Sequence, residues 1–565
     1  HDALPICAWV YNSIADFKTA VLAYKANPNL TTSPVAINRF NYRYTLLPNG
    51  QLPWQTLKVA TWSGYFQDEI QANKNLKLTW GLRGDYIDLA NTAKDYFNPV
   101  VSGLDFKNPN SNIIKINTAA MPKSRLYLSP RFGFNLDVNG KKTTQFRGGT
   151  GIFLSRMPYV LISNQLGNNG VNIGLVNVTG SAATAFPFTL DPLKYKPTTT
   201  DVTKLSGYNL NVNDENLKFP QIWKTDLALD HKFPFAGIVG TVEFIYNKAI
   251  NALYYIDANL NKSNSGFAGF DNRRTYPALD LSGAAATNAR FINSQIGSAY
   301  VLTNTNKGYS YTLTAKLEKP VINKWGGMIG YTYAKSKDLS SVSSTVNANI
   351  PSTNGVNYLD IALSDNDLRH RIVATGSYRI DYGKSIGGST TFSMGLVAAT
   401  GSKISYLYGN DMNGDGQIND LIFVPKQASD INFIQLTAGT TIFTPDQQVA
   451  AFNNYINNHP YLSTIKGDYA QRNGGQFPWL TRMDLSVEQE LFVRVGNKKN
   501  SFKIRADIFN FGNLINDKWG LGYLNTSATP LTYRGKNTAG QPLFTMATQV
   551  DRQTNSTILL RDAFL

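Results

Sequence analysis

The sequence predicts an all-β fold, a transmembrane antiparallel β-barrel with long extracellular loops and short periplasmic turns. First, apolar and polar residues alternate with period two in many segments, each at least about 9–11 residues long, as in a tilted strand that crosses a bilayer. Second, short turns alternate with much longer connections, which puts all the short turns on one side of the membrane. Third, no run of about 18 apolar residues exists, which excludes a transmembrane helix.

The composition agrees with a membrane barrel, excludes an internal disulfide and does not suggest a nucleic-acid-binding protein. The chain has 565 residues, of which 12% are aromatic, a content that suits the aromatic girdles of a membrane barrel. The single cysteine, Cys7, excludes an internal disulfide. The net charge of +16 fits either a lysine-rich surface or attraction to anionic lipid or cargo. Nucleic acid is not an expected partner, because the basic residues are scattered rather than clustered with aromatic residues.

The clearest element is a hairpin between residues 124 and 154. In its first half, alternate residues from Leu126 to Val138 are apolar or proline, and the residues between them are mostly polar. Asn139-Gly140 is a tight-turn signal, and the alternation resumes after it up to Leu154. The same plan recurs along the chain.

About twelve strands follow from this pattern. They are expected at residues 58–71, 76–88, 124–138, 143–154, 221–232, 237–249, 309–319, 325–334, 367–382, 389–399, 479–493 and 501–509. Short turns are expected at 72–75, 139–142, 233–236, 320–324, 383–388 and 496–500. Long connections are expected at 91–124, 155–219, 258–307, 338–365 and 401–478.

The two ends of the chain are expected to be extracellular. Residues 1–57 are interpreted as an irregular extracellular loop region with one short helix at 13–26, stopped by Asn27-Pro28. Residues 58–511 hold the barrel strands and their loops, and residues 512–565 are interpreted as the last extracellular loop before a missing final strand. Since bacterial barrels start and end on the periplasmic side, the sequence is interpreted as a fragment.

Several stretches resemble the barrel region of Oar-like TonB-dependent transporters of the Bacteroidota type. They are GYFQDEIQANKNLKLTWGLRGDYI, SPRFGFNLDVNGKKTTQFRGGTGIF, FPQIWKTDLALDHKFP, SDNDLRHRIVATGSYRIDY, DMNGDGQINDLIFVP, DLSVEQELFV and KIRADIFNFGNLIN, in that order along the chain. The resemblance implies a plugged barrel of about 22 strands in the bacterial outer membrane. It implies a receptor and transporter that binds its substrate on the extracellular loops and imports it.

The resemblance also implies partners. They are outer-membrane lipid, the TonB complex, reached through an N-terminal plug that this sequence does not contain, and a surface lipoprotein. The TonB box is likewise not in the sequence, so no energy-coupling residue can be assigned. A porin-like or assembly barrel without a plug stays open, as does a secreted all-β binding or adhesion protein, whose apolar faces would point inward.

One local motif points to calcium, in the segment DMNGDGQIND at 411–420. Asp411, Asn413 and Asp415 stand at alternate positions, Gly416 permits a sharp bend, and Gln417 would contribute its carbonyl, as in the first half of a calcium loop. The twelfth position is Ile422 instead of Glu, so Asp420 is the candidate for the remaining ligand. The alternative is a plain turn rich in Asn, Asp and Gly.

Charged residues on the polar faces of the strands form a second candidate set. Either they pair with each other and with a plug, or they mark a path for cargo. They are Arg131, Arg147, Lys224, Asp226, Arg369, Arg371, Arg379, Arg482, Asp484, Glu488, Arg505 and Asp507. His370 is interpreted as a girdle residue, and the four histidines lack the spacing of zinc ligands. No nucleophile elbow, phosphate loop or Cys–His pair is present, so no enzyme is expected.

Overall fold

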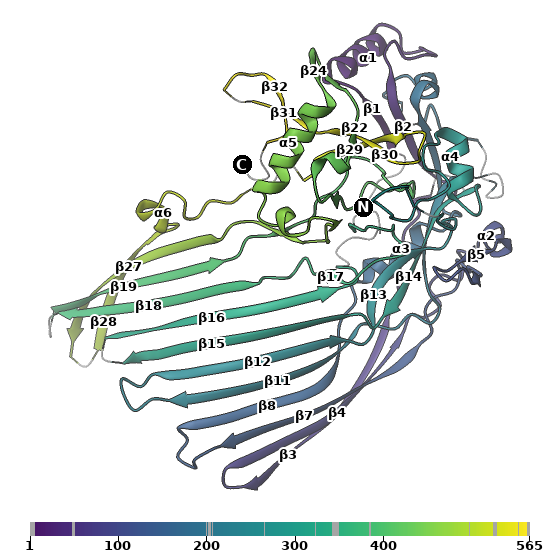
Figure 1. Ribbon diagram of the computed structural model, residues 1–565. Coiled ribbons are helices and arrows are strands. Elements are labelled where there is room, and N and C mark those ends of the chain that lie inside the picture. Colours follow the sequence, from purple (N-terminus) through teal and green to yellow (C-terminus); the bar gives the residue numbers. More distant parts are fainter. Residues whose placement is uncertain are drawn as a thin grey trace.

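Twelve long strands form one antiparallel sheet in the computed structural model, which confirms the predicted all-β class (Figure 1). Each strand pairs with its neighbours along the chain, and among the described residues the first and the last strand each pair on one side. The strands are β3 (Ala60–Asn73), β4 (Leu76–Asp88), β7 (Arg125–Asp137), β8 (Thr144–Leu154), β11 (Gln221–Lys232), β12 (Val239–Ala249), β15 (Gly308–Ile322), β16 (Trp325–Asp338), β18 (His370–Tyr382), β19 (Ile386–Ala399), β27 (Leu480–Val495) and β28 (Lys498–Ile508).

The structure describes most of the chain. The described residues are 6–47, 51–191, 193–198, 201, 205, 207–264, 266–322, 324–341, 350–382, 386–496, 498–523, 528–551 and 553–561. Parts of the turns predicted at 320–324, 383–388 and 496–500 and of the connection 338–365 lie outside them, as do residues 562–565. Within this described part, no helix combines the length and the apolar character needed to cross a membrane.

The register of the sheet separates an apolar face from a polar face. Leu227 lies opposite Phe244, and Phe244 lies opposite Leu313, so one apolar row crosses three strands. These side chains are 40%, 40% and 46% exposed, respectively. A soluble β-sandwich would bury such a row, whereas a barrel in a membrane turns it toward lipid. The exposed apolar face therefore rules out the secreted alternative.

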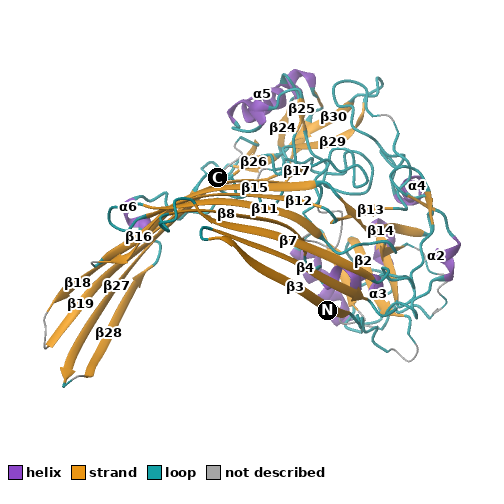
Figure 2. Cartoon of the chain, turned by 90° about the horizontal axis from the view of Figure 1, so that it is seen from below, coloured by secondary structure: helices purple, strands orange, loops and turns teal. Residues whose placement is uncertain are grey.

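Short turns and long connections lie at opposite ends of the sheet (Figure 1). The turns between β3 and β4, β7 and β8, and β11 and β12 stand together at one end, and the long connections gather at the other. Figure 2 shows that the sheet is strongly curved, with β18, β19, β27 and β28 running away from the earlier strands. This is the arrangement that the alternating connection lengths predict.

The long connections fold into a second structured region, here called the loop body. It comprises the described residues that lie outside the twelve long strands and their short turns, and it packs small sheets and helices together. One sheet joins β1 (Ile6–Tyr11), β2 (Ile37–Thr45) and β9 (Ile173–Thr179), a second joins β10 (Tyr208–Asn213), β14 (Ile296–Thr305) and β13 (Ala252–Asp257), and a third joins β22 (Asn432–Phe433), β30 (Pro542–Met546) and β29 (Leu531–Lys536).

Shorter elements complete the loop body. The helices are α1 (Ile14–Ala26), α2 (Pro99–Gly103), α3 (Tyr159–Gly167), α4 (Gly283–Arg290), α5 (Pro445–Asn458) and α6 (Gly512–Ile515). The remaining strands are β5 (Phe106–Lys107), β6 (Ile113–Ile114), β17 (Ala362–Leu363), β20 (Lys403–Ile404), β21 (Phe423–Val424), β23 (Leu436–Ala438), β24 (Thr441–Phe443), β25 (Asp468–Tyr469), β26 (Gly475–Gln476), β31 (Thr548–Val550) and β32 (Thr557–Leu559). Of these, β17 extends the main sheet by pairing with β16.

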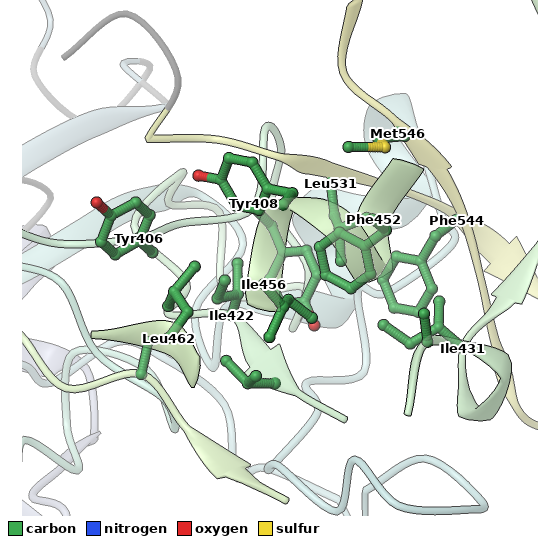
Figure 3. Close-up of a cluster of buried hydrophobic side chains, with 14 of the residues drawn as sticks. Tyr406, Tyr408, Ile422, Ile431, Phe452, Ile456, Leu462, Leu531, Phe544 and Met546 are labelled. Carbon is green, nitrogen blue, oxygen red and sulfur yellow. The ribbon is translucent and has the colours of Figure 1, made fainter. Parts of the chain in front are cut away.

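The loop body has hydrophobic cores of its own. The largest joins residues that are far apart in the sequence, such as Tyr408, Phe452 and Phe544, all of which are buried (Figure 3). The rings of Tyr408 and Phe544 stack with their centroids 5.4 Å apart. Burial of apolar area on this scale is what holds the long connections in one shape.

Two expectations about the chain ends were wrong in part. The described part of residues 1–57 is not irregular, because β1 pairs with β2 and β2 pairs with β9 from the connection after β8. The described part of residues 512–565 is not simply loop-like, because β29 and β30 form a sheet whose Phe544 enters the largest core. The short helix predicted at the N-terminal end is confirmed as α1, capped by Ser13, whose hydroxyl accepts a hydrogen bond from the Asp16 N–H.

Candidate functional site

A polar cavity of about 890 Å³ lies within the loop body. Its wall is formed by the segment after α2, by β10, β13 and β14, and by residues 354–360. Three cationic and three anionic side chains line it, Lys115, Arg274 and Lys307 with Asp214, Glu215 and Asp360. Seven asparagines join them: Asn108, Asn110, Asn117, Asn213, Asn216, Asn354 and Asn357. The lining is therefore close to neutral and rich in amides that both donate and accept hydrogen bonds.

A second cavity of about 560 Å³ adjoins the first. Arg274, Asn354 and Asp360 line both, so these residues stand between the two spaces. The Arg274 guanidinium lies over the Tyr358 ring at 4.2 Å from the centroid, and its backbone N–H donates to the Asn354 side chain at 3.0 Å. These contacts fix a cation between the cavities, where a ligand in either space could reach it.

The charges expected on the polar face are largely paired in the structure. Arg147 on β8 reaches two neighbouring strands, with Asp230 at 2.9 Å and Glu243 at 3.3 Å. Glu488 on β27 pairs with Lys503 on β28 at 2.8 Å. Arg379 bridges from β18 to Glu490 on β27 at 3.2 Å. These contacts are of the kind expected if the charged residues pair with each other, the first of the two interpretations of this set.

Many pairs form within a single strand, between residues two positions apart. Residues at this spacing point to the same face, so a cation and an anion can meet without a neighbouring strand. We call them strand-local ion pairs; they are Arg83–Asp85, Lys316–Glu318, Arg379–Asp381, Arg482–Asp484 and Arg505–Asp507. Arg369 pairs with Asp367 at 3.1 Å just before β18 begins.

The other members of the set have different surroundings. The Arg131 guanidinium lies over the Phe153 ring at 4.9 Å. Lys224 and Asp226 are half-buried on β11, and Arg371 is exposed on β18. His370 at the start of β18 contacts three aromatic rings, those of Tyr331, Tyr333 and Trp479, and its Nδ1 lies 2.7 Å from the Tyr331 hydroxyl. Its surroundings are those of an aromatic girdle.

The segment 411–420 is a folded turn whose side chains bind its own backbone. The Asp411 carboxylate accepts hydrogen bonds from the N–H groups of Gly414 and Gly416, at 2.6 and 2.8 Å. The Asn413 side-chain oxygen accepts from the Asp415 N–H at 2.8 Å. One Asp415 oxygen accepts from the Gln417 N–H at 2.8 Å, and the Gln417 amide donates to the Tyr300 hydroxyl.

Asp420 closes this turn. Its carboxylate accepts hydrogen bonds from the Met412 N–H and from the Asn413 side-chain amide, both at 2.7 Å. Among the residues that the structure describes, no three His, Cys, Asp or Glu side chains are arranged to hold a metal ion. The four side chains of the turn that the sequence singled out are thus close in space, but most of their oxygens are used inside the turn.

Burial makes this turn electrostatically unfavourable as it stands. Loss of water raises the pKa of Asp411, and burial together with repulsion from Asp411 raises the pKa of Asp415 to about 7. Burial raises the pKa of Asp420 well above its usual range, although Arg273 opposes the effect. Ionisation of any one of these three carboxyl groups therefore makes ionisation of the others less favourable.

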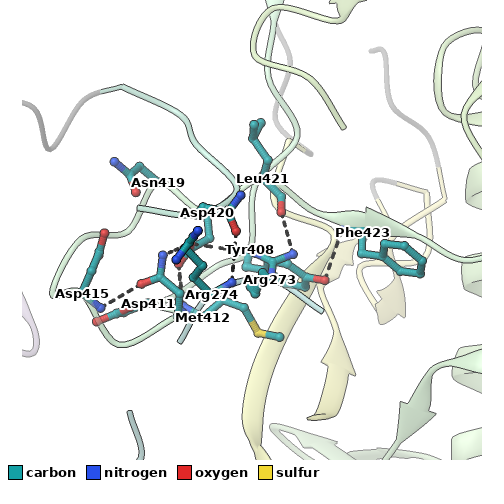
Figure 4. Close-up of polar contacts among 12 residues, drawn as sticks. Arg273, Arg274, Tyr408, Asp411, Met412, Asp415, Asn419, Asp420, Leu421 and Phe423 are labelled. Carbon is teal, nitrogen blue, oxygen red and sulfur yellow. Dashed lines mark hydrogen bonds and ion pairs between the residues drawn. The ribbon is translucent and has the colours of Figure 1, made fainter. Parts of the chain in front are cut away.

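Two further residues, Asp271 and Arg273, complete this site, and the sequence analysis did not find them. Figure 4 shows Arg273 beside Asp420 and Tyr408. Arg273 is fully buried, its Nε donates to Asp271 at 2.9 Å, and it donates to the Leu421 carbonyl. Its guanidinium lies over the rings of Tyr408 and Tyr469, at 4.8 and 5.3 Å, and 3.8 Å from Asp420. No periodicity or motif marks them, because an Asp and an Arg in a loop usually belong to the solvated surface.

Comparison with known proteins finds a family and several structures. A family model described as "Outer membrane beta barrel domain" matches residues 16–541. No curated protein matches the sequence.

Three solved structures illustrate the structural likeness. A mutant of the ferric enterobactin receptor PfeA from Pseudomonas aeruginosa is 10% identical with a TM-score of 0.37, over 86% of this chain and 46% of that one. The outer membrane transporter YddB from Escherichia coli is 13% identical with a TM-score of 0.35, over 80% and 44%. The copper transporter OprC is 10% identical with a TM-score of 0.33, over 85% and 44%. The chain spans less than half the length of each.

Proposed function

The chain belongs to the outer membrane β-barrel domain family, and from this premise we propose that it is the barrel part of a TonB-dependent importer. In this proposal the loop body receives the cargo outside the cell, and the cargo passes inward through the barrel when TonB acts on the plug. The protein resides in the outer membrane. Its proposed role is binding and transport, with no catalytic step.

The observation that supports this proposal most is the folded state of the long connections. They build hydrophobic cores and enclose the 890 Å³ cavity at the end of the sheet opposite the short turns. A cavity of this size lies in the range of small-molecule sites, about 300–1,000 Å³. A plain pore needs no such cavity, so the loop body is the part of the molecule that suits a receptor.

The lining of the cavity suits a polar cargo of low net charge. The three cationic and three anionic side chains balance one another, and the asparagines offer both donors and acceptors. A multiply charged anionic chelate would be expected to meet an excess of cationic side chains instead. Arg274, in contact with both cavities, is the residue best placed to orient the cargo.

The proposal includes partners outside the sequence described here. The plug and the TonB complex are those that the sequence resemblance implies, and a surface lipoprotein that meets the loop body belongs to the same pattern. The barrel without a plug, porin-like or assembling other proteins, is the competing function. It differs from the importer in one physical property, an open lumen.

The test uses the complete protein in its own cells and in planar bilayers. Wild-type cells should remove the cargo from their growth medium. Cells that lack this protein, or that lack TonB, should leave the same compounds in the medium. Arg274→Ala should reduce that depletion, whereas Arg534→Ala, an exposed arginine of β29 away from both cavities, should not. A steady conductance at the moment of insertion into the bilayer, with depletion independent of TonB, would establish the open barrel and refute the importer.

A further inference from the structure

Three buried oxygen atoms beside the 411–420 turn have no hydrogen-bond partner. They are Oδ2 of Asp415, Oδ1 of Asn419 and Oγ of Ser352. The three residues are 3%, 2% and 4% exposed. An unpaired buried polar atom costs about 1–3 kcal/mol, and folded proteins contain few, so several at one place call for a ligand, an ion or a water.

The three oxygens belong to two segments that pack directly together. The Ser352 N–H donates to the Asn419 carbonyl at 3.1 Å, and the Leu421 N–H donates to the Ser352 carbonyl at 2.9 Å. The Asn419 amide donates to the Ile350 carbonyl at 2.9 Å. The Asp415 carboxyl turns toward the same segment, because a Cβ on Gly355 would lie 2.8 Å from its Oδ2. The Val356 N–H lies near enough to favour the charged form of Asp415 but does not meet hydrogen-bond geometry at Oδ2.

The arrangement divides the turn into two ends (Figure 4). Asp415 and Asn419 lie at the end away from Tyr408 and Phe423, where their free oxygens are found. Arg273 holds the opposite end, close to Asp420. The Arg273 guanidinium is therefore already engaged, and the cation nearer to Asp415 is Arg290, which lies 3.8 Å from Asp411 and favours the charged form of Asp415.

With all of its carboxyl groups ionised, the cluster carries a net negative charge. Asp271, Asp411, Asp415 and Asp420 carry four negative charges when ionised, and Arg273 and Arg290 carry two positive charges. The difference, two minus four, is a net charge of −2. Arg274 lies nearby, but its guanidinium stacks on Tyr358 at the cavity wall. One divalent cation would balance the cluster.

We propose that a calcium ion binds between the 411–420 turn and residues 350–356, with Asp415 Oδ2 and Asn419 Oδ1 as ligands and the Ser352 hydroxyl beside them. Calcium takes six to eight oxygen ligands of mixed type in flexible geometry, whereas zinc prefers nitrogen and sulfur. Magnesium requires near-ideal octahedral geometry and retains its waters. The ion joins two long connections, so it fastens the loop body at the wall of the second cavity, which Ser352 lines.

This ligand set differs from the one that sequence spacing alone predicts. The oxygens of Asp411 and of the Asn413 side chain already accept hydrogen bonds, so these residues supply charge and shape. Asn419, which the spacing does not single out, takes their place as a ligand. The Asp420 carboxylate likewise holds the turn together, and the Gln417 side-chain amide connects the turn to Tyr300 of β14; the Gln417 carbonyl stays a candidate ligand.

The experiment measures calcium binding by the full protein in detergent after chelator treatment. Isothermal titration with Ca²⁺ should give one site per chain with a dissociation constant of about 10⁻⁴–10⁻³ M, and Mg²⁺ should bind more weakly. Terbium ions in the same site should show luminescence sensitised by Tyr276 and Tyr300, whose rings lie next to Gly355 and Gln417. Tyr276→Phe should lower this luminescence without abolishing binding.

Two variants and one control make the test specific. Asp415→Asn and Asn419→Ala should each weaken Ca²⁺ binding at least about tenfold, since the first removes the charge of a ligand and the second removes a ligand oxygen. Asp95→Asn, at an exposed carboxylate in another long connection, should bind as the wild type does. Absence of Ca²⁺ binding to the wild type, or wild-type affinity in both Asp415→Asn and Asn419→Ala, would overturn the proposal. Because these outcomes concern only the ion, they are separate from the fate of the importer proposal.

Discussion

Arg273 shows how much depends on one residue in the loop body. It is fully buried, it carries the positive charge next to Asp271 and Asp420, and two tyrosine rings cover its guanidinium. Removing one member of a buried ion pair leaves the partner charged and without compensation, which costs about 3–5 kcal/mol. Arg273→Ala should therefore lower the free energy of unfolding of the loop body by that amount.

Hydrogen exchange of the loop-body amides would measure this loss. Arg534→Ala is the matched control, because Arg534 is exposed and its one side-chain hydrogen bond goes to Thr545. Its cost should stay within about 1 kcal/mol. Equal costs for the two variants would show that the Arg273 network does not hold the loop body together.

His459 gives the loop body a dependence on pH. Burial lowers the pKa of His459 to about 4, and its Nδ1 accepts the N–H groups of Tyr461 and Leu462. An unfolded histidine titrates near about 6.5, so the neutral form stabilises the fold fully above that pH. This contribution, up to about 3 kcal/mol, should be lost as the pH falls from 6.5 through 4.

Thermal unfolding of the wild type and of His459→Asn between pH 7 and pH 4 would test this. The asparagine oxygen can still accept a hydrogen bond from a backbone N–H, but asparagine does not titrate. The variant should therefore be less stable than the wild type at pH 7, and this difference in stability should disappear as the pH falls toward 4. Asp415, with its raised pKa, acts in the opposite direction, and the difference between the two proteins removes its contribution.

At the scale of elements, β15 allows a direct test of the two faces. Leu313 and Thr314 are neighbours at one depth, Leu313 being exposed on the apolar face and Thr314 half-buried on the polar face. Leu313→Lys should cost about 2–4 kcal/mol near the middle of the bilayer, because a charge then faces lipid. Thr314→Lys should cost under about 1 kcal/mol. Urea titration of the full protein in lipid vesicles measures both, and a reversed order would exchange the faces.

The long strands were predictable from the sequence, because their physical signal is local. Two faces in different environments impose period two on each strand, and a lipid-facing strand must be long. All twelve predicted strands are present, and β4 and β11 have the predicted bounds. Their ends shift by a few residues elsewhere, as for β16, which runs to Asp338. That extension has no alternation of hydrophobic residues to mark it.

The loop body and most of the site were not predictable in this way. Its strands are two to ten residues long, and β2 pairs with β9, which lies more than one hundred residues further along the chain. Such pairing depends on non-local contacts, which no window of sequence displays. The spacing of Asp411 and Asp415 in the sequence marked them as site residues. Arg273 and Asn419 belong to the site only because long connections that are separate in the sequence contact each other in the fold.

At the scale of the whole molecule, all long connections should be outside the cell. In a Cys7→Ser background, Asp446→Cys on α5 and Lys141→Cys in the turn at 139–142 place single exposed thiols at the two ends of the sheet. A maleimide that does not cross membranes should label Asp446→Cys on intact cells. It should label Lys141→Cys only after the outer membrane is opened. The reverse result would invert the topology.

The strand-local ion pairs have a consequence for how the sheet is assembled. A pair such as Arg505–Asp507 or Arg482–Asp484 needs only its own strand, so its charges are compensated before the next strand arrives. Arg147 is different, because its partners Asp230 and Glu243 arrive 83 and 96 residues later in the chain. Contacts that close short loops form early and those that close long loops form late. During assembly of the sheet, the charge of Arg147 on β8 is therefore compensated only when β11 and β12 have joined, later than the charges of the strand-local ion pairs.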